Sequence, residues 1–313
     1  TIHQFYPIDH AIFSRKFLDY WKPNIAIFLE SEIWPSMFKS IKNRNILLIL
    51  LNARITKKSF DRWSKFKEFS YSIFGLIDKA YSQNSETNHY LKRLNVKNIQ
   101  SIGNMKFIED DNIKSDKSDK KLFSQFKKYK TFIAASTHET EELFAAKTHI
   151  LLKKKNKNII TIIIPRHINR VKQIIAEINE LGLNVVSRSS KKLKLKGIDI
   201  FIVDTFGETK KFYKFATTVF LGKSIIKGGG QNPLEPARFG AKILHGPDVN
   251  NFKDVYKYLR KLKISSVVNS PQKCADSIIF KKNMKKVQKM KYLGSTILKK
   301  TLNELDKSIH NEI

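Results

Sequence analysis

The chain has 313 residues, enough for two domains of about 150 residues each. Its apolar fraction of 41% is ordinary for a folded globular protein and excludes a disordered or fibrous chain. A single cysteine, Cys274, excludes an internal disulfide bond and favours a reducing, cytoplasmic compartment.

Charge is the unusual feature, because 59 Lys and Arg residues stand against 28 Asp and Glu residues and give a net charge of +31. This balance predicts attraction to a polyanion: a nucleic acid, an anionic membrane surface or a phosphorylated substrate. Overuse of lysine on every solvated surface explains the charge equally well. No apolar run approaches the roughly 18 residues of a membrane span. Since the chain opens on Thr1, we expect a fragment whose anchor or targeting segment would lie upstream.

In the first half, short apolar runs predict strands at 25–29, 46–51, 79–81 and 99–102, with helices around 35–42, 59–74 and 86–94. The second half repeats this alternation, and its expected strands are 131–135, 159–164, 185–186, 198–203, 218–221 and 242–244. Apolar runs without polar alternation, spaced by helices, indicate parallel sheets covered on both faces. The predicted fold class is therefore α/β.

A charged stretch with almost no apolar residues, 109–121, is predicted to be a linker. It separates an N-terminal domain, 1–108, from a C-terminal domain, 122–282. The lysine-rich stretch 283–313 is expected to form a helical tail packed back on the body. Doubly wound domains bind ligands at the carboxyl ends of their strands, so the polar turns that follow the predicted strands are the candidate sites.

Two such turns carry residues suited to an anion. Ser136 or Thr137 is expected to cap a helix whose first turn holds 139–142, and the free N–H groups there would bind an anion. A plain capping box explains the same pattern, although it does not need His138. Arg166 follows the next strand and is able to hold a phosphate or carboxylate in a bidentate fork, or to be an ordinary solvated arginine.

Two later turns contain glycine. Gly207, in the turn 204–208, permits close backbone approach, and Glu208 is expected to open the following helix; a simple turn is the alternative. The stretch 222–237 contains three consecutive glycines, 228–230, which are usually tolerated where something must come close. Asn232 is expected to cap a helix with Pro233 at its first position, and Glu235 either completes a capping box or turns toward the ribose of a nucleotide. The glycine spacing excludes a P-loop ATPase.

Several site classes find no support in the sequence. The eight histidines are scattered, and no His, Asp or Glu set has the spacing of a metal site. No RNP-like aromatic pair, zinc-finger spacing or helix-turn-helix signature indicates nucleic-acid binding.

Seven motifs together carry a family resemblance. They are Glu30-Ser31-Glu32-Ile33-Trp34-Pro35, Asn52-Ala53-Arg54-Ile55-Thr56, Gly103-Asn104-Met105-Lys106-Phe107, Ser136-Thr137-His138, Pro165-Arg166-His167, Asp204-Thr205-Phe206-Gly207-Glu208 and Gly229-Gly230-Gln231-Asn232-Pro233-Leu234-Glu235-Pro236-Ala237. In this order they resemble the 3-deoxy-D-manno-octulosonic acid (Kdo) transferases, which move Kdo from CMP-Kdo to the lipid A precursor. The resemblance implies two Rossmann-like domains that face a cleft (GT-B type), with the N-terminal domain truncated at its start.

The resemblance also implies an inverting glycosyltransferase of lipopolysaccharide biosynthesis. Arg166 would hold the CMP phosphate or the sugar carboxylate, and the backbone around Phe206, Gly207 and Glu208 would contact the cytosine. Asn232 would orient the donor, and Glu235 would bind the ribose. The remaining implied residues are Ser136, Thr137 and His138 on the donor side and Glu30, Arg54 and Lys106 on the acceptor side.

By the same resemblance, no cofactor or metal is expected, the general base would lie upstream of Thr1, and the enzyme would work at the cytoplasmic face of the inner membrane, peripheral or anchored by the upstream segment. CMP-Kdo, the lipid A precursor and the anionic membrane surface would be the partners, with no nucleic acid. The chain departs from the family pattern at Gln231, where His is usual, at Lys223, where Gly is usual, and at Ser36, where Asn is expected. A GT-B transferase that uses another nucleotide sugar, or a non-catalytic basic protein that binds nucleic acid or anionic lipid, is the alternative.

Overall fold

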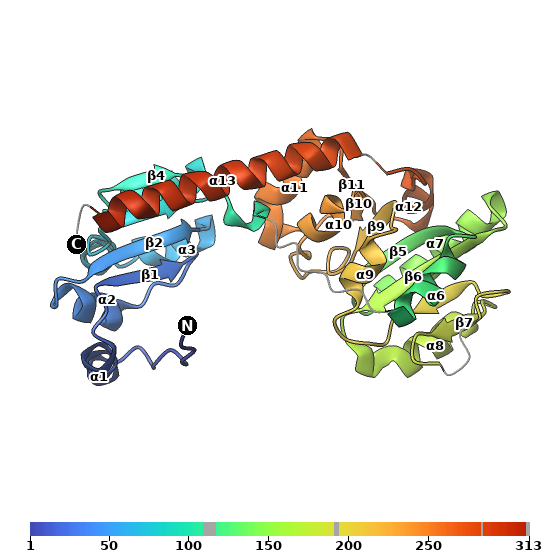
Figure 1. Cartoon of the computed structure of the whole chain (residues 1–313), viewed down its shortest axis with the longest axis horizontal. Coiled ribbons are helices and arrows are strands. Elements are labelled where there is room, and N and C mark those ends of the chain that lie inside the picture. Colours follow the sequence, from blue (N-terminus) through green and yellow to red (C-terminus); the bar gives the residue numbers. More distant parts are fainter. Residues whose placement is uncertain (109–116, 191–193, 283, 311–313) are drawn as a thin grey trace. The chain divides into compact units, whose positions relative to one another are not determined.

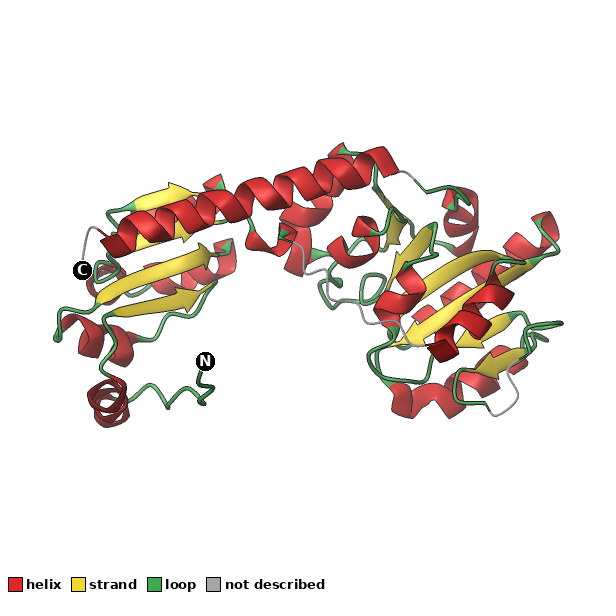
Figure 2. Ribbon diagram, viewed as in Figure 1, coloured by secondary structure: helices red, strands yellow, loops and turns green. Residues whose placement is uncertain are grey.

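The computed structural model describes residues 1–108, 117–190, 194–282 and 284–310 (Figure 1). The chain divides into two compact units. Unit 1 comprises Thr1–Glu109 and Tyr292–Ile313, and unit 2 comprises Asp110–Lys291. Strands alternate with helices through both units, as the apolar pattern predicts (Figure 2).

Unit 1 is built on a four-stranded parallel sheet of order β1-β2-β3-β4. Its strands are β1 (Ile25–Leu29), β2 (Leu47–Ala53), β3 (Lys79–Ser82) and β4 (Ile99–Ser101). Its helices are α1 (Ala11–Trp21), α2 (Pro35–Lys42), α3 (Lys57–Ser64), α4 (Lys67–Phe74), α5 (Ser85–Arg93), the 3-10 turn η1 (Met105–Phe107) and the C-terminal part of α13 (Met284–His310).

Both faces of β2 are covered, because every residue of this strand is buried, whereas Ile27 and Leu29 of β1 are exposed. One face packs on α2, which begins with Pro35 at its first position and buries Phe38. The other face packs on α13 through Leu305. The Tyr81 hydroxyl of β3 donates a hydrogen bond to the Glu304 carbonyl of α13 at 3.1 Å, which ties the helix to the sheet.

Unit 2 is built on a seven-stranded parallel sheet of order β11-β10-β9-β5-β6-β8-β7. Its strands are β5 (Lys130–Thr137), β6 (Ile159–Pro165), β7 (Val185–Ser187), β8 (Ile200–Ile202), β9 (Thr218–Leu221), β10 (Lys242–His245) and β11 (Ser265–Val267). Its helices are α6 (Lys117–Phe126), α7 (Glu141–Lys155), η2 (Ile168–Arg170), α8 (Val171–Asn179), α9 (Thr209–Tyr213), α10 (Leu234–Arg238), η3 (Asn250–Phe252), α11 (Lys253–Lys261) and α12 (Pro271–Ser277).

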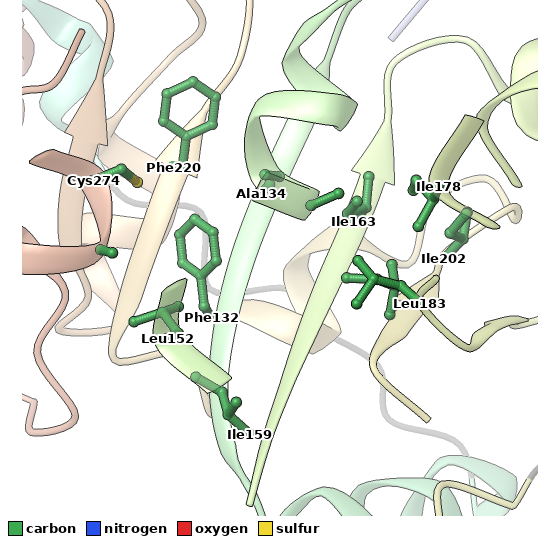
Figure 3. Packing of buried hydrophobic residues seen from close by; sticks show 14 of the residues in the cluster. Phe132, Ala134, Leu152, Ile159, Ile163, Ile178, Leu183, Ile202, Phe220 and Cys274 are labelled. Carbon is green, nitrogen blue, oxygen red and sulfur yellow. The ribbon is translucent and has the colours of Figure 1, made fainter. Parts of the chain in front are cut away.

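The main core of unit 2 lies between the sheet and three helices, α7, α8 and α12 (Figure 3). Strand residues such as Phe132 and Ile163 pack there against Ile178 of α8 and Cys274 of α12. The opposite face is covered by α6 and α9, since the Phe126 and Phe201 rings meet edge to face at 5.1 Å and Phe212 packs beside them. A sheet covered on both faces explains why its strands read as continuous apolar runs.

The order of the strands creates a topological switch point between β5 and β9. From β5 the chain moves outward to β6, β7 and β8 on one side, then crosses to β9, β10 and β11 on the other side. All strands are parallel, so the turns after β5, β6, β8, β9 and β10 lie at the same edge of the sheet. This edge is where open α/β sheets bind ligands.

The structure confirms the α/β class and the predicted parallel sheets, with several corrections. The predicted helix 59–74 is two helices, α3 and α4, and the structure adds α1 and β11. Most of the predicted linker lies outside the described residues, but 117–121 begin α6 and so belong to unit 2. The last part of the tail belongs to unit 1, so the domain prediction 1–108 omitted that contribution.

The terminal helix packs on the body as predicted and buries one of its faces. Met290 and Ile297 are buried, whereas Leu298 and Leu302 are exposed, because the inner face continues through Gly294 and Thr301. None of the helices in the described ranges combines the length and apolar character that a bilayer crossing requires.

Candidate functional site

The turns after β5, β6 and β9 touch one another at the carboxyl edge of the unit 2 sheet. The Gly222 N–H donates a hydrogen bond to the Ala135 carbonyl at 2.9 Å, and the Arg166 N–H donates to the Thr137 carbonyl at 2.9 Å. A Cβ atom at Gly222 would lie 2.4 Å from the Ser136 carbonyl oxygen, so only glycine fits there. The structure therefore brings together three of the predicted turns.

Glu141, the first residue of α7, connects the turn after β5 to the turn after β9 through hydrogen bonds. Its side chain is fully buried, and one carboxylate oxygen, Oε2, accepts hydrogen bonds from the N–H groups of His138 at 3.0 Å and Lys223 at 2.7 Å. The other oxygen, Oε1, accepts from the N–H groups of Ser224 and Ile225, both at 3.0 Å. One carboxylate thus satisfies four backbone donors from two turns.

The expected cap at Ser136 or Thr137 is wrong. Thr137 is the last residue of β5, and α7 begins only at Glu141, with Thr140 as its N-cap and no side-chain cap hydrogen bond. The Glu141 carboxylate accepts from the N–H groups of His138, Lys223, Ser224 and Ile225, so these donors are not available to an anion. The only sequence signal for this role was the acidic pair Glu141 and Glu142 at a helix start.

The triple glycine is explained by contacts within the chain. The N–H groups of Gly228 and Gly229 both donate to Asp248 Oδ2, at 2.9 and 3.1 Å. Gly229 has φ +80°, and a Cβ there would lie 2.4 Å from Asn251 Nδ2. The close approach that the three glycines predicted is therefore made by the segment 248–251 of this chain.

His138 and Arg166 provide the polar groups that these internal contacts leave available. His138 Nδ1 lies 3.1 Å from the Ser136 carbonyl oxygen, and its ring meets the His167 ring edge to face at 5.5 Å. Burial lowers the pKa of His138, and the nearby charges of His167 and Lys223 lower it further. Arg166 is exposed, and its guanidinium forms no ion pair with the described residues.

The turn after β8 contains an exposed aromatic ring and a carboxylate that already has hydrogen-bond partners within the chain. The Phe206 side chain is 80% exposed, which makes it available for stacking, and Gly207 has φ +76°. Glu208 precedes α9 as predicted, but its carboxylate accepts hydrogen bonds from Arg188 Nε at 3.1 Å and from Lys211 Nζ at 3.2 Å. Burial opposes ionisation of Glu208, yet these hydrogen bonds hold its pKa below the ordinary value. Because the carboxylate of Glu208 is occupied, the backbone of this residue is the part that is available to a ligand.

Asn232 and Glu235 lie around the start of α10. Asn232 Oδ1 accepts a hydrogen bond from the Leu234 N–H at 3.1 Å, but the predicted cap is wrong by one residue, because Pro233 occupies the N-cap position and α10 begins at Leu234. Glu235 is half-buried in the first turn, and no described residue donates a hydrogen bond to its carboxylate. Unlike Glu208, it is free to accept from a ligand.

Unit 1 has a corresponding cluster at the carboxyl ends of β1 and β2. The Glu30 N–H donates to the Leu51 carbonyl, and the Arg54 N–H donates to the Glu30 carbonyl, both at 3.0 Å. Lys106 Nζ pairs with Glu30 Oε1 at 2.9 Å. Asn52 Oδ1 accepts from the Met105 N–H at 3.0 Å, which fixes the turn that carries Lys106. The three predicted acceptor-side residues Glu30, Arg54 and Lys106 therefore converge.

Backbone strain is concentrated at these turns. Among the described residues, nine with side chains have a positive φ. Four of them end helices, where this conformation is ordinary. The other five lie at the carboxyl ends of the strands of the two clusters or in the residues that follow them: Glu30, Asn52, Ser136, Thr140 and Lys223. Strained conformations of this kind are concentrated at functional sites.

The described residues place no group of three or more His, Cys, Asp or Glu side chains where they could share a metal ion.

Comparison with known proteins relates the chain to one family. Residues 1–109 match the family model of the 3-deoxy-D-manno-octulosonic-acid transferases. A 3-deoxy-D-manno-octulosonic acid transferase of Rickettsia felis is 37% identical over 257 residues, which are 82% of this chain and 55% of that protein. A probable mitochondrial member from Arabidopsis thaliana is 31% identical over 277 residues, which are 85% of this chain and 62% of that protein. The chain spans about half the length of the curated relatives it matches.

Solved structures share the fold at low sequence identity. A putative UDP-N-acetylglucosamine 2-epimerase from Listeria monocytogenes has a TM-score of 0.57 at 12% identity and covers 94% of this chain and 78% of its own. An α,α-trehalose-phosphate synthase from Burkholderia vietnamiensis has a TM-score of 0.58 at 7% identity and covers 95% and 75%. In sequence, the chain is similar to 3-deoxy-D-manno-octulosonic acid transferases over most of its length, as its motifs indicate.

Proposed function

We propose that the chain binds CMP-Kdo through unit 2 and transfers Kdo to a lipid A precursor, with inversion at the anomeric carbon. The observation that carries the proposal is the convergence of two family motifs, those of Thr137 and Arg166, with the turn that begins at Gly222, at the switch point of the unit 2 sheet. The sequence relationship to Kdo transferases supplies the identity of the transferred sugar.

The donor side has the chemistry that a nucleotide sugar requires. A departing CMP gains negative charge on its phosphate, and an exposed, unpaired Arg166 is able to neutralise this charge through a bidentate fork. The exposed ring of Phe206 offers a stacking surface beside the backbone of Gly207 for the cytosine. Asn232 orients the donor phosphate or sugar, and the carboxylate of Glu235 accepts from the ribose hydroxyls.

Ser136, Thr137 and His138, at the end of β5, are assigned to the donor side of the site. Glu141 fixes the His138 peptide, and a neutral His138 that donates through Nδ1 to the Ser136 carbonyl keeps Nε2 as an acceptor. Because burial favours the neutral ring, His138 is suited to accept a hydroxyl proton in a hydrogen bond rather than to carry a permanent charge.

The acceptor side is assigned to unit 1. Arg54 and Lys106 are cations at one sheet edge, suited to a phosphorylated disaccharide lipid. Glu30 is ion-paired with Lys106, so we assign it to holding that cation and to accepting from sugar hydroxyls, not to proton abstraction. The net charge of +31 suits a peripheral position on the anionic cytoplasmic face of the inner membrane.

A transfer assay tests the proposal. The chain, with any segment upstream of Thr1 included, is incubated with CMP-Kdo and lipid IVA, and the lipid fraction is examined by mass spectrometry for a Kdo-bearing product. The proposal predicts that product together with release of CMP. A folded, CMP-binding chain that forms no Kdo-bearing lipid would contradict the assignment of transfer to this chain.

A further inference from the structure

Lys223 is the side chain at the switch point that neither the motifs nor the proposed function uses. It lies two residues after the end of β9, in a turn that contacts the end of β5 through Gly222, and its side chain is half-buried. Its φ of +57° lies in the left-handed region, which suits glycine and strains a residue with a Cβ atom. A lysine is thus present where the backbone conformation would favour the glycine that the family motif usually has.

Both peptide groups of Lys223 are held by short hydrogen bonds. Its N–H donates to Glu141 Oε2 at 2.7 Å, and its carbonyl accepts from the Gly230 N–H at 2.7 Å. The aliphatic part of the side chain packs along Gly228, where an added Cβ would lie 2.5 Å from Lys223 Cγ and 3.0 Å from Cε. The backbone and the stem of Lys223 are therefore ordered before any ligand binds.

The ammonium group of Lys223 forms no ion pair with the residues that the structure describes. The Glu141 carboxylate beneath it is turned toward four backbone N–H groups, which use its acceptor capacity. The charge of Lys223 lowers the pKa of His138. The backbone N–H groups of Lys223 and His138 both donate to Glu141 Oε2. Arg166 lies in the adjoining turn, after β6. Two cationic side chains, Lys223 and Arg166, therefore lie at this edge of the sheet, and neither pairs with an acidic side chain of the described residues.

This arrangement differs from a P-loop, in which backbone N–H groups cradle the phosphate. Here the N–H groups of Lys223, Ser224 and Ile225 bind Glu141, and those of Gly228 and Gly229 bind Asp248. These five N–H groups are therefore not available to an anionic ligand, which side chains are able to bind instead.

We propose that Lys223 is a binding residue for the anionic group of the donor, the phosphate of the nucleotide or the carboxylate of its sugar, and that Glu141 positions it. This inference rests on the proposed function of unit 2. The contact is a feature of this chain, because it depends on a side chain that the usual glycine lacks.

Calorimetric titration with CMP tests the inference on the full chain. Lys223→Gly removes the ammonium group and relieves the left-handed strain, so this variant is expected to fold at least as well as the wild type. Its affinity for CMP is expected to fall by about ten-fold, the usual contribution of one charge-assisted hydrogen bond. Lys223→Arg is expected to retain most of the affinity. Lys227→Gln, an exposed lysine of the same loop, is the matched control and is expected to bind CMP as the wild type does.

Further ligands separate the sources of the anion. Affinity for cytidine, which has no phosphate, is expected to be the same in Lys223→Gly and the wild type. Loss of CMP affinity assigns Lys223 to the phosphate, whereas unchanged CMP affinity with weaker CMP-Kdo binding assigns it to the sugar carboxylate. Equal binding of both CMP and CMP-Kdo by Lys223→Gly and the wild type overturns the inference.

The positioning role of Glu141 has its own readout. Glu141→Gln places an amide against backbone donors, so hydrogen exchange at the amides of Lys223, Ser224 and Ile225 is expected to accelerate and CMP affinity to fall. Glu142→Gln is the matched control, since Glu142 is equally buried but pairs with Arg170. If Glu141→Gln and Glu142→Gln show the same protection of these amides from hydrogen exchange and the same affinity for CMP, the positioning role of Glu141 is overturned.

Failure of the proposed function would be distinguishable. If the wild type binds neither CMP nor CMP-Kdo, the proposed function fails, and inorganic phosphate becomes the probe. Weaker phosphate binding by Lys223→Gly would then still support an anion site at Lys223, and equal binding by the two proteins would overturn it.

Discussion

Arg166 and Arg170 lie four residues apart after β6 and are expected to respond in opposite ways to replacement by alanine. The Arg166 side chain is exposed and unpaired among the described residues, and the backbone hydrogen bond from its N–H to Thr137 survives the change. Arg166→Ala should therefore alter the free energy of unfolding by less than about 0.5 kcal/mol. Loss of a bidentate contact to the CMP phosphate should cost about 1.5–3 kcal/mol of binding, which is roughly ten- to a hundred-fold in affinity.

Arg170 instead neutralises a buried group. Its Nη1 lies 3.3 Å from Oε1 of Glu142, whose side chain is only 1% exposed. Burial raises the pKa of Glu142, and the charge of Arg170 acts against that rise. Arg170→Ala leaves the carboxyl without its partner, which should lower the free energy of unfolding by about 1–3 kcal/mol while affinity for CMP changes little.

Urea unfolding gives the free energy of unfolding of each variant, and calorimetric titration gives the affinity of each variant for CMP. Arg166→Ala should lose affinity at unchanged stability, and Arg170→Ala should lose stability at nearly unchanged affinity. An Arg166→Ala protein that binds CMP as tightly as the wild type would remove Arg166 from the donor site. Equal losses of affinity in both variants would show that the effect comes from general disruption of the turn.

Two further predictions concern stability. Burial lowers the pKa of His245 to about 4, so the unfolded chain binds more protons than the native state between that value and the ordinary value of about 6.5. The free energy of unfolding should therefore fall by up to about 3 kcal/mol as the pH drops through this window, and urea titrations of His245→Phe should show a flatter pH dependence. Gly222→Ala should lose about 1–3 kcal/mol, because its Cβ would lie 2.4 Å from the Ser136 carbonyl oxygen and 2.6 Å from Thr137 Cα, both backbone atoms. Gly182→Ala, where nothing lies within 4 Å of the added Cβ, should lose only about 1 kcal/mol for its positive φ, and equal losses in urea unfolding would contradict the contact argument.

Most of the strands were predictable because they are continuous apolar runs; burial on both faces accounts for such a run in β9, whereas β1 is partly exposed. The strands β1 and β9 begin and end where the sequence predicts, at 25–29 and 218–221. The short strand β11, Ser265–Val267, gave no such run, since two of its three residues are serines. Its pairing with β10 is a tertiary contact that local sequence does not encode.

The turns were harder to predict, because their partners are distant in sequence. Ser136 and Thr137 have the composition of a helix cap, but α7 begins at Glu141, whose carboxylate accepts a hydrogen bond from the N–H of Lys223, 82 residues away along the chain. The triple glycine indicated a close approach correctly, yet only the structure shows that Asn251 makes it. The convergence of Glu30, Arg54 and Lys106 followed from a parallel sheet, whose turns share one edge.

The central claim is that unit 2 binds a cytidine nucleotide at the switch point between β5 and β9. Calorimetric titration of the chain with CMP and with UMP under identical low-salt conditions tests this claim most directly. The account predicts that CMP binds more tightly than UMP and that Arg166→Ala weakens CMP binding by ten-fold or more, roughly 1.4 kcal/mol. Tighter binding of UMP, or CMP binding that is unaffected by Arg166→Ala, would contradict it.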